Sequence, residues 1–150
     1  MSSFSNMIVD GTKATPLSEH HIKQENNVEL SEIFQSIGPF LDGVQNQLSS
    51  QFSEFDTEIS PYAKYVLSRQ GKQLRAALSG LAANCVGGWN DSVIRVAVIV
   101  EMVHLATLVH DDIIDEAEVR RGLPTLANKW GNSVAVLTGD CLFAHSLKLA

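Results

Sequence analysis

The sequence is poor in cysteine and in positive charge. Its two cysteines, Cys85 and Cys141, lie far apart in helix-like contexts and show no metal-ligand spacing. We therefore expect reduced, buried thiols, as in a cytoplasmic protein. The net charge of −6 excludes nucleic acid as a main partner, because a phosphate backbone binds to a basic surface. A small anion held at one local basic site is still compatible with this charge.

Long hydrophobic runs and a leader pattern are also missing. The longest purely apolar run near the centre covers residues 96–100, which is too short to span a bilayer, so we expect no transmembrane segment. The N-terminus lacks the basic and then apolar layout of a signal peptide. It carries Asp10, Glu19 and Glu25 but no arginine before Arg69, which argues against a mitochondrial leader. We expect a cytoplasmic location.

The composition is that of a globular domain, with 45% hydrophobic and 19% charged residues. Residues 1–26 are polar and aperiodic, and we expect a flexible tail there, followed by one domain over residues 27–150. From residue 28 to residue 48, apolar residues recur at steps of three and four, which predicts a helix that Gly38 and Pro39 bend or divide.

The rest of the sequence also predicts helices and no hairpin. We expect one after Pro61, one over residues 72–86, a long one over residues 92–118 with Asn90 or Asp91 as its cap, and shorter ones after Pro124 and after residue 132. The long segment is rich in β-branched residues, but its length excludes a strand. The fold class is therefore all-α, with a central helix that is apolar nearly all round.

An acidic cluster ends the long helix, in the stretch "LVHDDIIDEAEVRRG". Asp111 and Asp115 are four residues apart, so they share one helical face, where two like charges cost a few tenths of a kcal/mol. Mg²⁺ reverses that cost because it prefers carboxylate oxygens and commonly bridges them to a substrate phosphate. The pair predicts a magnesium–diphosphate site. The alternative is a solvated helix end in which Arg120 and Arg121 form plain ion pairs.

A second anion site is predicted by "GKQLRAAL", in which Lys72 and Arg75 are three residues apart at an expected helix start. The N-terminus of a helix attracts anions through its free N–H groups and its dipole. His104 lies seven residues before Asp111, about two turns away on the same face. Taken alone, His104 is more typical of a satisfied core histidine.

Three segments together resemble motifs of the trans-isoprenyl diphosphate synthase family, also called polyprenyl synthetases. They are "GKQLRAAL", "HLATLVHDDIIDEAEVRRGLPT" and "WGNSVAVLTGDCLF", and the similarity covers residues 28–150. The likeness is greatest to long-chain synthases of the hepta- and octaprenyl type. It implies the isoprenoid-synthase helical bundle. A lone DDxxD also occurs in terpene cyclases, but those lack the basic site, since they have no isopentenyl diphosphate to hold.

The resemblance implies a prenyltransferase reaction. An allylic diphosphate ionises, the double bond of isopentenyl diphosphate attacks the allylic cation, and loss of a proton gives a longer polyprenyl diphosphate. In this sequence Asp111 and Asp115 would bind Mg²⁺ with Asp112 in support, and Arg120 would contact the allylic diphosphate. These residues form the expected catalytic and metal-binding set.

The resemblance also assigns the second substrate and the product length. Lys72, Arg75, His104 and Arg121 would hold isopentenyl diphosphate. Bulky aromatic residues just before the aspartate motif limit chain growth in this family. The corresponding positions here are small, Ala106 and Thr107, and the resemblance therefore implies a long-chain product, such as the side chain of a quinone.

Two departures from the family pattern stand out. Ala76 occupies the position of a usual proline, and we expect little effect from this change. The second aspartate-rich motif of the family is missing, and the chain ends at Ala150 in what reads as an unfinished helix. We therefore expect the N-terminal half of the bundle, truncated at Ala150, with half of a metal site and no activity alone. The alternative is a non-catalytic partner subunit. The family resemblance also implies a homodimer.

Overall fold

The computed structural model describes residues 30–68 and 71–150, so the tail predicted for residues 1–26 lies outside the described residues. Its elements follow one another along the chain as helices, with one small hairpin before the last two. They are α1 (Leu30–Ser36), α2 (Gly38–Ser53), α3 (Ser60–Leu67), α4 (Leu74–Cys85), α5 (Asp91–Ile114), β1 (Val119–Arg120), β2 (Leu123–Pro124), α6 (Leu126–Trp130) and α7 (Asn132–Leu149). The predicted all-α class is confirmed.

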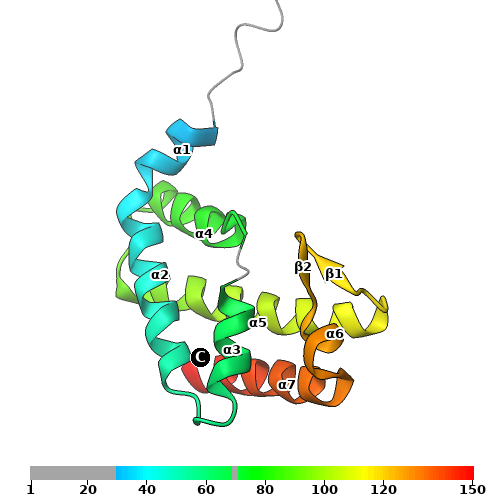
Figure 1. The fold of residues 1–150 in the computed structure, drawn as a ribbon. Coiled ribbons are helices and arrows are strands. Elements are labelled where there is room, and N and C mark those ends of the chain that lie inside the picture. Colours follow the sequence, from blue (N-terminus) through cyan, green and yellow to red (C-terminus); the bar gives the residue numbers. More distant parts are fainter. Residues whose placement is uncertain (1–29, 69–70) are drawn as a thin grey trace, which may run out of the picture.

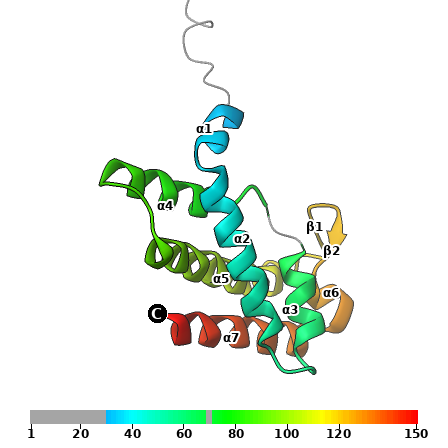
Figure 2. The ribbon, with the colours of Figure 1, turned by 90° about the vertical axis from the view of Figure 1, so that its left-hand side faces the viewer.

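The long helix α5 is the centre of the fold (Figures 1 and 2). The last helix, α7, runs alongside it in the opposite direction, α4 lies on the other side, and α2 crosses it. Val98, Met102 and Leu105 of α5 are buried, together with Phe40 of α2 and Leu142 of α7. The apolar surface of α5 is thus shared among several neighbours, because no single partner could cover a helix that is apolar nearly all round. It is not buried on every side, since Val96 and Val100 are exposed.

Several helix boundaries lie where the sequence placed them. α1 ends and α2 begins on either side of Ile37, next to the predicted break at Gly38. Asn90 caps α5, and its side-chain oxygen accepts hydrogen bonds from the N–H groups of Ser92 (3.0 Å) and Val93 (3.2 Å). Thr125 caps α6 by accepting from the N–H of Asn128 at 3.1 Å.

Replacing Asn90 with alanine is expected to lower the free energy of unfolding by about 1 kcal/mol, because two first-turn N–H groups of α5 lose their acceptor. Urea denaturation followed by circular dichroism measures the change. The matched control is Asn46→Ala, at an exposed position within α2, where alanine is the better helix former. Equal stabilities of the Asn90→Ala and wild-type chains would contradict the capping role.

The predicted end of α5 at residue 118 is wrong. The helix ends at Ile114, and Asp115 forms its C-cap. Glu116 then adopts a left-handed conformation with φ of 51°, which a continuing right-handed helix excludes. The following residues leave the helix axis and enter the hairpin.

The hairpin itself also corrects the sequence analysis, which predicted none. β1 pairs antiparallel with β2, so that Arg120 lies opposite Leu123. Arg121 (φ 54°) and Gly122 (φ 77°) form the two-residue turn, and both have the positive φ values that such a tight connection requires. Strands of two residues are too short to show an alternating pattern, and Arg-Gly is a less typical turn pair than Asn-Gly.

The prediction that both cysteines are buried is wrong. Cys85 is exposed in the last turn of α4, and Cys141 is partly exposed on α7. Apolar neighbours in the sequence place a residue in a helix, but they do not fix which face it occupies. Both thiols are free.

Helix α5 is long and apolar enough, by length and composition alone, to cross a membrane, with a mean hydropathy of 1.9 in its most apolar window. The sequence criterion of an unbroken apolar run did not detect this. The observation is weak, because the core helix of a soluble protein passes the same test. In this structure α5 packs against α2, α4 and α7.

Candidate diphosphate and metal site

The acidic end of α5 presents two exposed carboxylates. The N–H of Asp115 donates to the carbonyl oxygen of Asp111 at 2.8 Å, so the two residues are one turn apart. They stand at the negative end of the helix dipole, and the last turn of α5 holds no basic residue. The two carboxylates repel each other there, and the negative end of the dipole repels each of them as well. A bound cation would relieve it.

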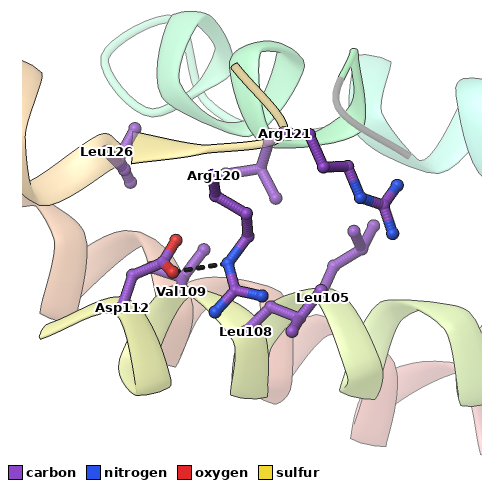
Figure 3. Close-up of a pocket in the computed structure, with 8 residues that line it drawn as sticks. Leu105, Leu108, Val109, Asp112, Arg120, Arg121 and Leu126 are labelled. Atoms are coloured by element: carbon purple, nitrogen blue, oxygen red, sulfur yellow. Dashed lines mark hydrogen bonds and ion pairs between the residues drawn. The ribbon is translucent and has the colours of Figure 1, made fainter. Parts of the chain in front are cut away.

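Asp112 lies on a different side of the helix, where it is only 6% exposed. Its Oδ1 accepts a hydrogen bond from Nε of Arg120 at 2.5 Å (Figure 3). The sequence analysis expected Asp112 to support the metal and Arg120 to contact a diphosphate. The structure brings the two together as a charge-assisted pair, which is the shorter and stronger kind of hydrogen bond.

Within residues 30–68 and 71–150, no three His, Cys, Asp or Glu side chains gather in a way that could hold a metal ion. Asp111 and Asp115 are therefore a partial ligand set. Such a set fits Mg²⁺, which retains several waters and is usually bound by one or two carboxylates plus substrate phosphates. It does not fit a metal that needs a complete cage of protein ligands.

A basic pocket lies between the start of α4 and the middle of α5. It contains all four residues that the sequence analysis assigned to one anion, together with an acid that it overlooked. The lining residues are Gly71, Lys72, Gln73, Leu74, Arg75, Glu101, His104 and Arg121. Three separate segments of the chain contribute: the stretch that enters α4, the central helix and the hairpin turn.

Lys72 does not lie within a helix, which corrects the prediction of a helix starting at residue 72. α4 begins at Leu74, after Gln73 in a left-handed conformation with φ of 50°. The side chain of Gln73 donates to Oε1 of Gln45 on α2. This contact attaches the bend to α2, so that Lys72 and Arg75 can both line the pocket.

The hairpin reaches across to this bend. A Cβ atom added to Gly71 would overlap the guanidinium group of Arg121. Any larger residue at position 71 would therefore displace Arg121. This close approach brings the hairpin turn up to the residue that precedes Lys72.

The two adjacent arginines of the hairpin serve different ends of the site. Arg120 extends to Asp112 at the acidic end of α5, whereas Arg121 extends in another direction, to the basic pocket (Figure 3). The hairpin is anchored by the hydroxyl of Tyr65, which donates to the carbonyl of Pro124 at 2.8 Å. The hydroxyl of Thr125 also donates to the carbonyl of Ala117 at 2.7 Å. The hairpin thus connects the basic pocket, through Arg121, with Asp112 at the end of α5, through Arg120.

Backbone strain is concentrated in the same region. Among the described residues, the non-glycine positions with positive φ are Gln73, Glu116 and Arg121. Each such conformation is unfavourable for an ordinary side chain, and strained residues cluster where a structure holds functional groups in place. All three border the carboxylates or the basic pocket.

The pKa of His104 lies below the ordinary histidine value of 6.5. Burial is the main cause, the positive charge of Arg75 adds to it, and the negative charge of Glu101 opposes it in part. His104 is therefore neutral near pH 7 and accepts a proton more readily once an anion enters the pocket.

Titration of His104 should show this coupling. Because its folded-state pKa is below the unfolded value, His104 lowers the stability of the fold as pH falls below 6.5 and ceases to do so above it. Inorganic pyrophosphate should raise the pKa, so its affinity should increase as pH falls through the same window. NMR titration of the imidazole protons measures both effects. His145, whose pKa is also lowered by burial, is the internal control outside the pocket. A His104 pKa that stays unchanged when pyrophosphate saturates the chain would contradict the coupling.

The two residues expected to affect product length lie in different surroundings. Thr107 is exposed and lines an apolar groove along α5 with Val100 and Val103. Ala106 is 1% exposed and belongs to the core. On this chain alone, Thr107 is therefore the residue that can border a ligand in the groove.

The sequence analysis did not single out Glu101, Gly71 or Tyr65. Glu101 carried a signal that could have been used, namely a lone acid inside a long apolar segment. Such an acid is rarely buried without a partner. Tyr65 carried none, because its contact with Pro124 joins residues 59 positions apart.

Known proteins are similar to this chain over the region that contains the candidate site. A sequence model of the polyprenyl synthetase family matches residues 56–150. The geranylgeranyl diphosphate synthase of Methanosarcina mazei is 42% identical over 92 residues, which cover 61% of this chain and 28% of that protein. Heptaprenyl diphosphate synthase component 2 of Geobacillus stearothermophilus is 36% identical over 81% of this chain and 38% of that protein.

Solved structures show the same likeness. A decaprenyl diphosphate synthase from Rhodobacter capsulatus superposes with a TM-score of 0.73 and 35% identity, over 79% of this chain and 37% of that one. A polyprenyl synthase from Caulobacter crescentus, complexed with calcium and isoprenyl diphosphate, gives 0.73 and 32%, over 79% and 36%. This chain spans well under half the length of these relatives.

The protein is helical apart from one small hairpin, and that hairpin brings Arg121 to the basic pocket and Arg120 to Asp112 at the end of the central helix. With the family match over residues 56–150, the chain belongs to the polyprenyl synthetase family. The resemblance seen in the sequence motifs is confirmed.

Proposed function

We propose that this chain acts in a trans-prenyltransferase, which joins isopentenyl diphosphate to an allylic diphosphate and yields a longer polyprenyl diphosphate. The observation that carries this proposal is the hairpin, which places Arg121 in the basic pocket and Arg120 at the carboxylate end of α5. Two diphosphate groups held side by side are what such a condensation needs. The names of the relatives support the same reaction class.

The basic pocket and the pair of Asp111 and Asp115 then have different roles. Lys72, Arg75, His104 and Arg121 bind the diphosphate of isopentenyl diphosphate directly. Asp111 and Asp115 would hold Mg²⁺, which acts as a Lewis acid on the allylic diphosphate leaving group. The apolar surface beside α5 keeps water away from the allylic cation.

Arg120 has a double role in this proposal. Its Nε is held by the buried carboxylate of Asp112, which fixes the guanidinium group near the end of α5. The allylic diphosphate would then meet a positioned cation. Asp112 acts on Arg120 in this scheme, beside its expected support of the metal.

A long-chain product is part of the proposal. Thr107 is small and lines the apolar groove, which leaves room for a growing chain. Relatives named for long products, heptaprenyl and decaprenyl, are 36% and 35% identical to this chain, although the similar geranylgeranyl synthase is named for a shorter product. We further propose a homodimer in the cytoplasm, which light scattering after gel filtration can test.

The second candidate function is a non-catalytic partner subunit. One feature of the sequence favours a partner subunit: the sequence contains one DDxxD motif, whereas the family has two aspartate-rich motifs. One relative is named component 2 of a synthase. A partner subunit would, however, have no need to keep the basic pocket and the paired carboxylates intact.

Binding of inorganic pyrophosphate tests the proposal at the level of this chain. We expect isothermal titration calorimetry to show binding without metal, and tighter binding with Mg²⁺. Replacing Asp111 with asparagine should remove the gain from Mg²⁺ while leaving metal-free binding unchanged, because the basic pocket is intact. Asp42→Asn, at an exposed position on α2, is the control. Equal affinities with and without Mg²⁺ would contradict the metal-binding role.

Radiolabelled isopentenyl diphosphate, an allylic primer and Mg²⁺ test the reaction itself. We expect no incorporation of label by the purified 150-residue chain, because its sequence supplies only one of the family's two aspartate motifs. Robust condensation by this chain alone would overturn the expectation. Release of a hydrocarbon from the primer alone would indicate a cyclase instead.

A further inference from the structure

Glu101 is a buried acid inside a pocket that is otherwise basic. It is 5% exposed, and it lines the pocket together with Arg75, His104 and Arg121. By charge alone, a carboxylate beside an anion site weakens the attraction of the anion. Its presence there therefore requires a separate physical reason.

That reason lies in the contact between α5 and α4. The N–H of Ala76 donates to Oε1 of Glu101 at 3.1 Å, and both residues are buried. Ala76 is in the first turn of α4, where backbone N–H groups have no acceptor within their own helix. The first such bond of α4 runs from the N–H of Ala77 to the carbonyl of Gln73. Glu101 thus caps α4 from a neighbouring helix.

We propose that Glu101 is a positioning residue for the basic pocket, acting through this hydrogen bond. Arg75 precedes Ala76 on α4, and His104 follows Glu101 by three residues, about one turn, on α5. This buried hydrogen bond therefore joins the two walls of the pocket at the point where Arg75 and His104 lie. The inference rests on the proposed function, since it concerns how that pocket holds a diphosphate.

The contact requires a backbone N–H at position 76. Proline has no backbone N–H and cannot donate. Position 76 is where this chain departs from the motif that it resembles, which has proline there. Alanine thus gives this chain a hydrogen bond that a proline would exclude, and the substitution is not neutral for the pocket.

Three variants separate the hydrogen bond from the charge. Glu101→Gln keeps an oxygen acceptor and removes the charge, Glu101→Leu removes both, and Ala76→Pro removes the donor and keeps the carboxylate. Proline is tolerated in the first turn of a helix, so Ala76→Pro should fold, and thermal unfolding checks each variant. The readouts are pyrophosphate affinity by calorimetry and exchange of the Ala76 amide proton by NMR in the other two variants.

We expect Glu101→Leu and Ala76→Pro to weaken pyrophosphate binding by about tenfold, the effect of one lost buried hydrogen bond. Glu101→Gln should bind at least as well as the unaltered chain, since the acceptor stays and a repelling charge is gone. Exchange at Ala76 should be slow in the unaltered chain and in Glu101→Gln, and fast in Glu101→Leu.

Two results would overturn the inference. One is unchanged Ala76 exchange in Glu101→Leu, and the other is a loss of affinity in Glu101→Gln as large as that in Glu101→Leu. Failure of the unaltered chain to bind pyrophosphate would instead contradict the proposed function. The exchange measurement needs no ligand, so it decides the positioning contact in that case too.

Discussion

Arg121→Asn is expected to weaken pyrophosphate binding by about tenfold to a hundredfold, the range for losing charge-assisted hydrogen bonds. Arg121 lines the basic pocket from the hairpin turn, where its φ is 54°. Asparagine tolerates this left-handed conformation better than most residues. The substitution therefore removes the guanidinium group while it preserves the turn.

Calorimetry with inorganic pyrophosphate measures the loss, and urea denaturation shows whether the fold is kept. Arg95→Asn is the matched control, since Arg95 is exposed on α5 and lines neither the basic pocket nor the groove beside it. We expect that control to change affinity less than twofold, because an exposed charge outside contact distance is largely screened. Similar losses in both variants would mean that the effect is one of net charge, and the assignment of Arg121 to the pocket would be wrong.

The fold class could be predicted from the sequence because the apolar residues that the helices bury recur with a clear helical period. The steps of three and four over residues 28–48 correspond to a side of α2 whose Phe40, Val44 and Leu48 are all buried. Asn90 was recognisable as a cap because its side chain acts within three residues of its own position. Local physical effects of this kind can be deduced from a single sequence.

The hairpin could not be deduced in the same way. Its strands are two residues long, and its place is fixed by contacts with distant parts of the chain, such as that between Tyr65 and Pro124. The sequence analysis therefore extended α5 by four residues and placed Arg120 and Arg121 at the end of a helix. On a helix, adjacent residues differ in direction by about 100°, but only the turn explains how Arg121 reaches Gly71.

The candidate site was predicted residue by residue from motif resemblance, whereas its internal connections were not. Lys72, Arg75, His104 and Arg121 were assigned to one anion, and the structure places all four around one pocket. The two buried acids beside these residues, Asp112 and Glu101, are bonded to partners that no spacing rule identifies. Their roles depend on burial, which follows from the packing of whole helices against one another.

Gly80 on α4 is closely packed, and from this packing we predict a second large effect. A Cβ atom at this position would lie 2.6 Å from Cδ1 of Phe40, whose side chain is fully buried and stacks edge-on against Trp89. In an open helix, glycine to alanine would gain up to about 1 kcal/mol. Here we expect Gly80→Ala to lower the free energy of unfolding by about 1–3 kcal/mol, because the ring has no room to move.

Urea denaturation of Gly80→Ala and three further variants tests this reversal of sign. Gly38→Ala is the matched control, since nothing lies within 4 Å of a Cβ there, and it should not destabilise the chain. Phe40→Leu should restore part of the loss when combined with Gly80→Ala, so that the double variant is less destabilised than the sum of the two single variants. Additive losses would mean that Gly80 and Phe40 do not compete for the same space. Because α4 carries Arg75, a shift of this helix away from α2 would also disturb the basic pocket, and the stability loss of Gly80→Ala should therefore be accompanied by weaker pyrophosphate binding.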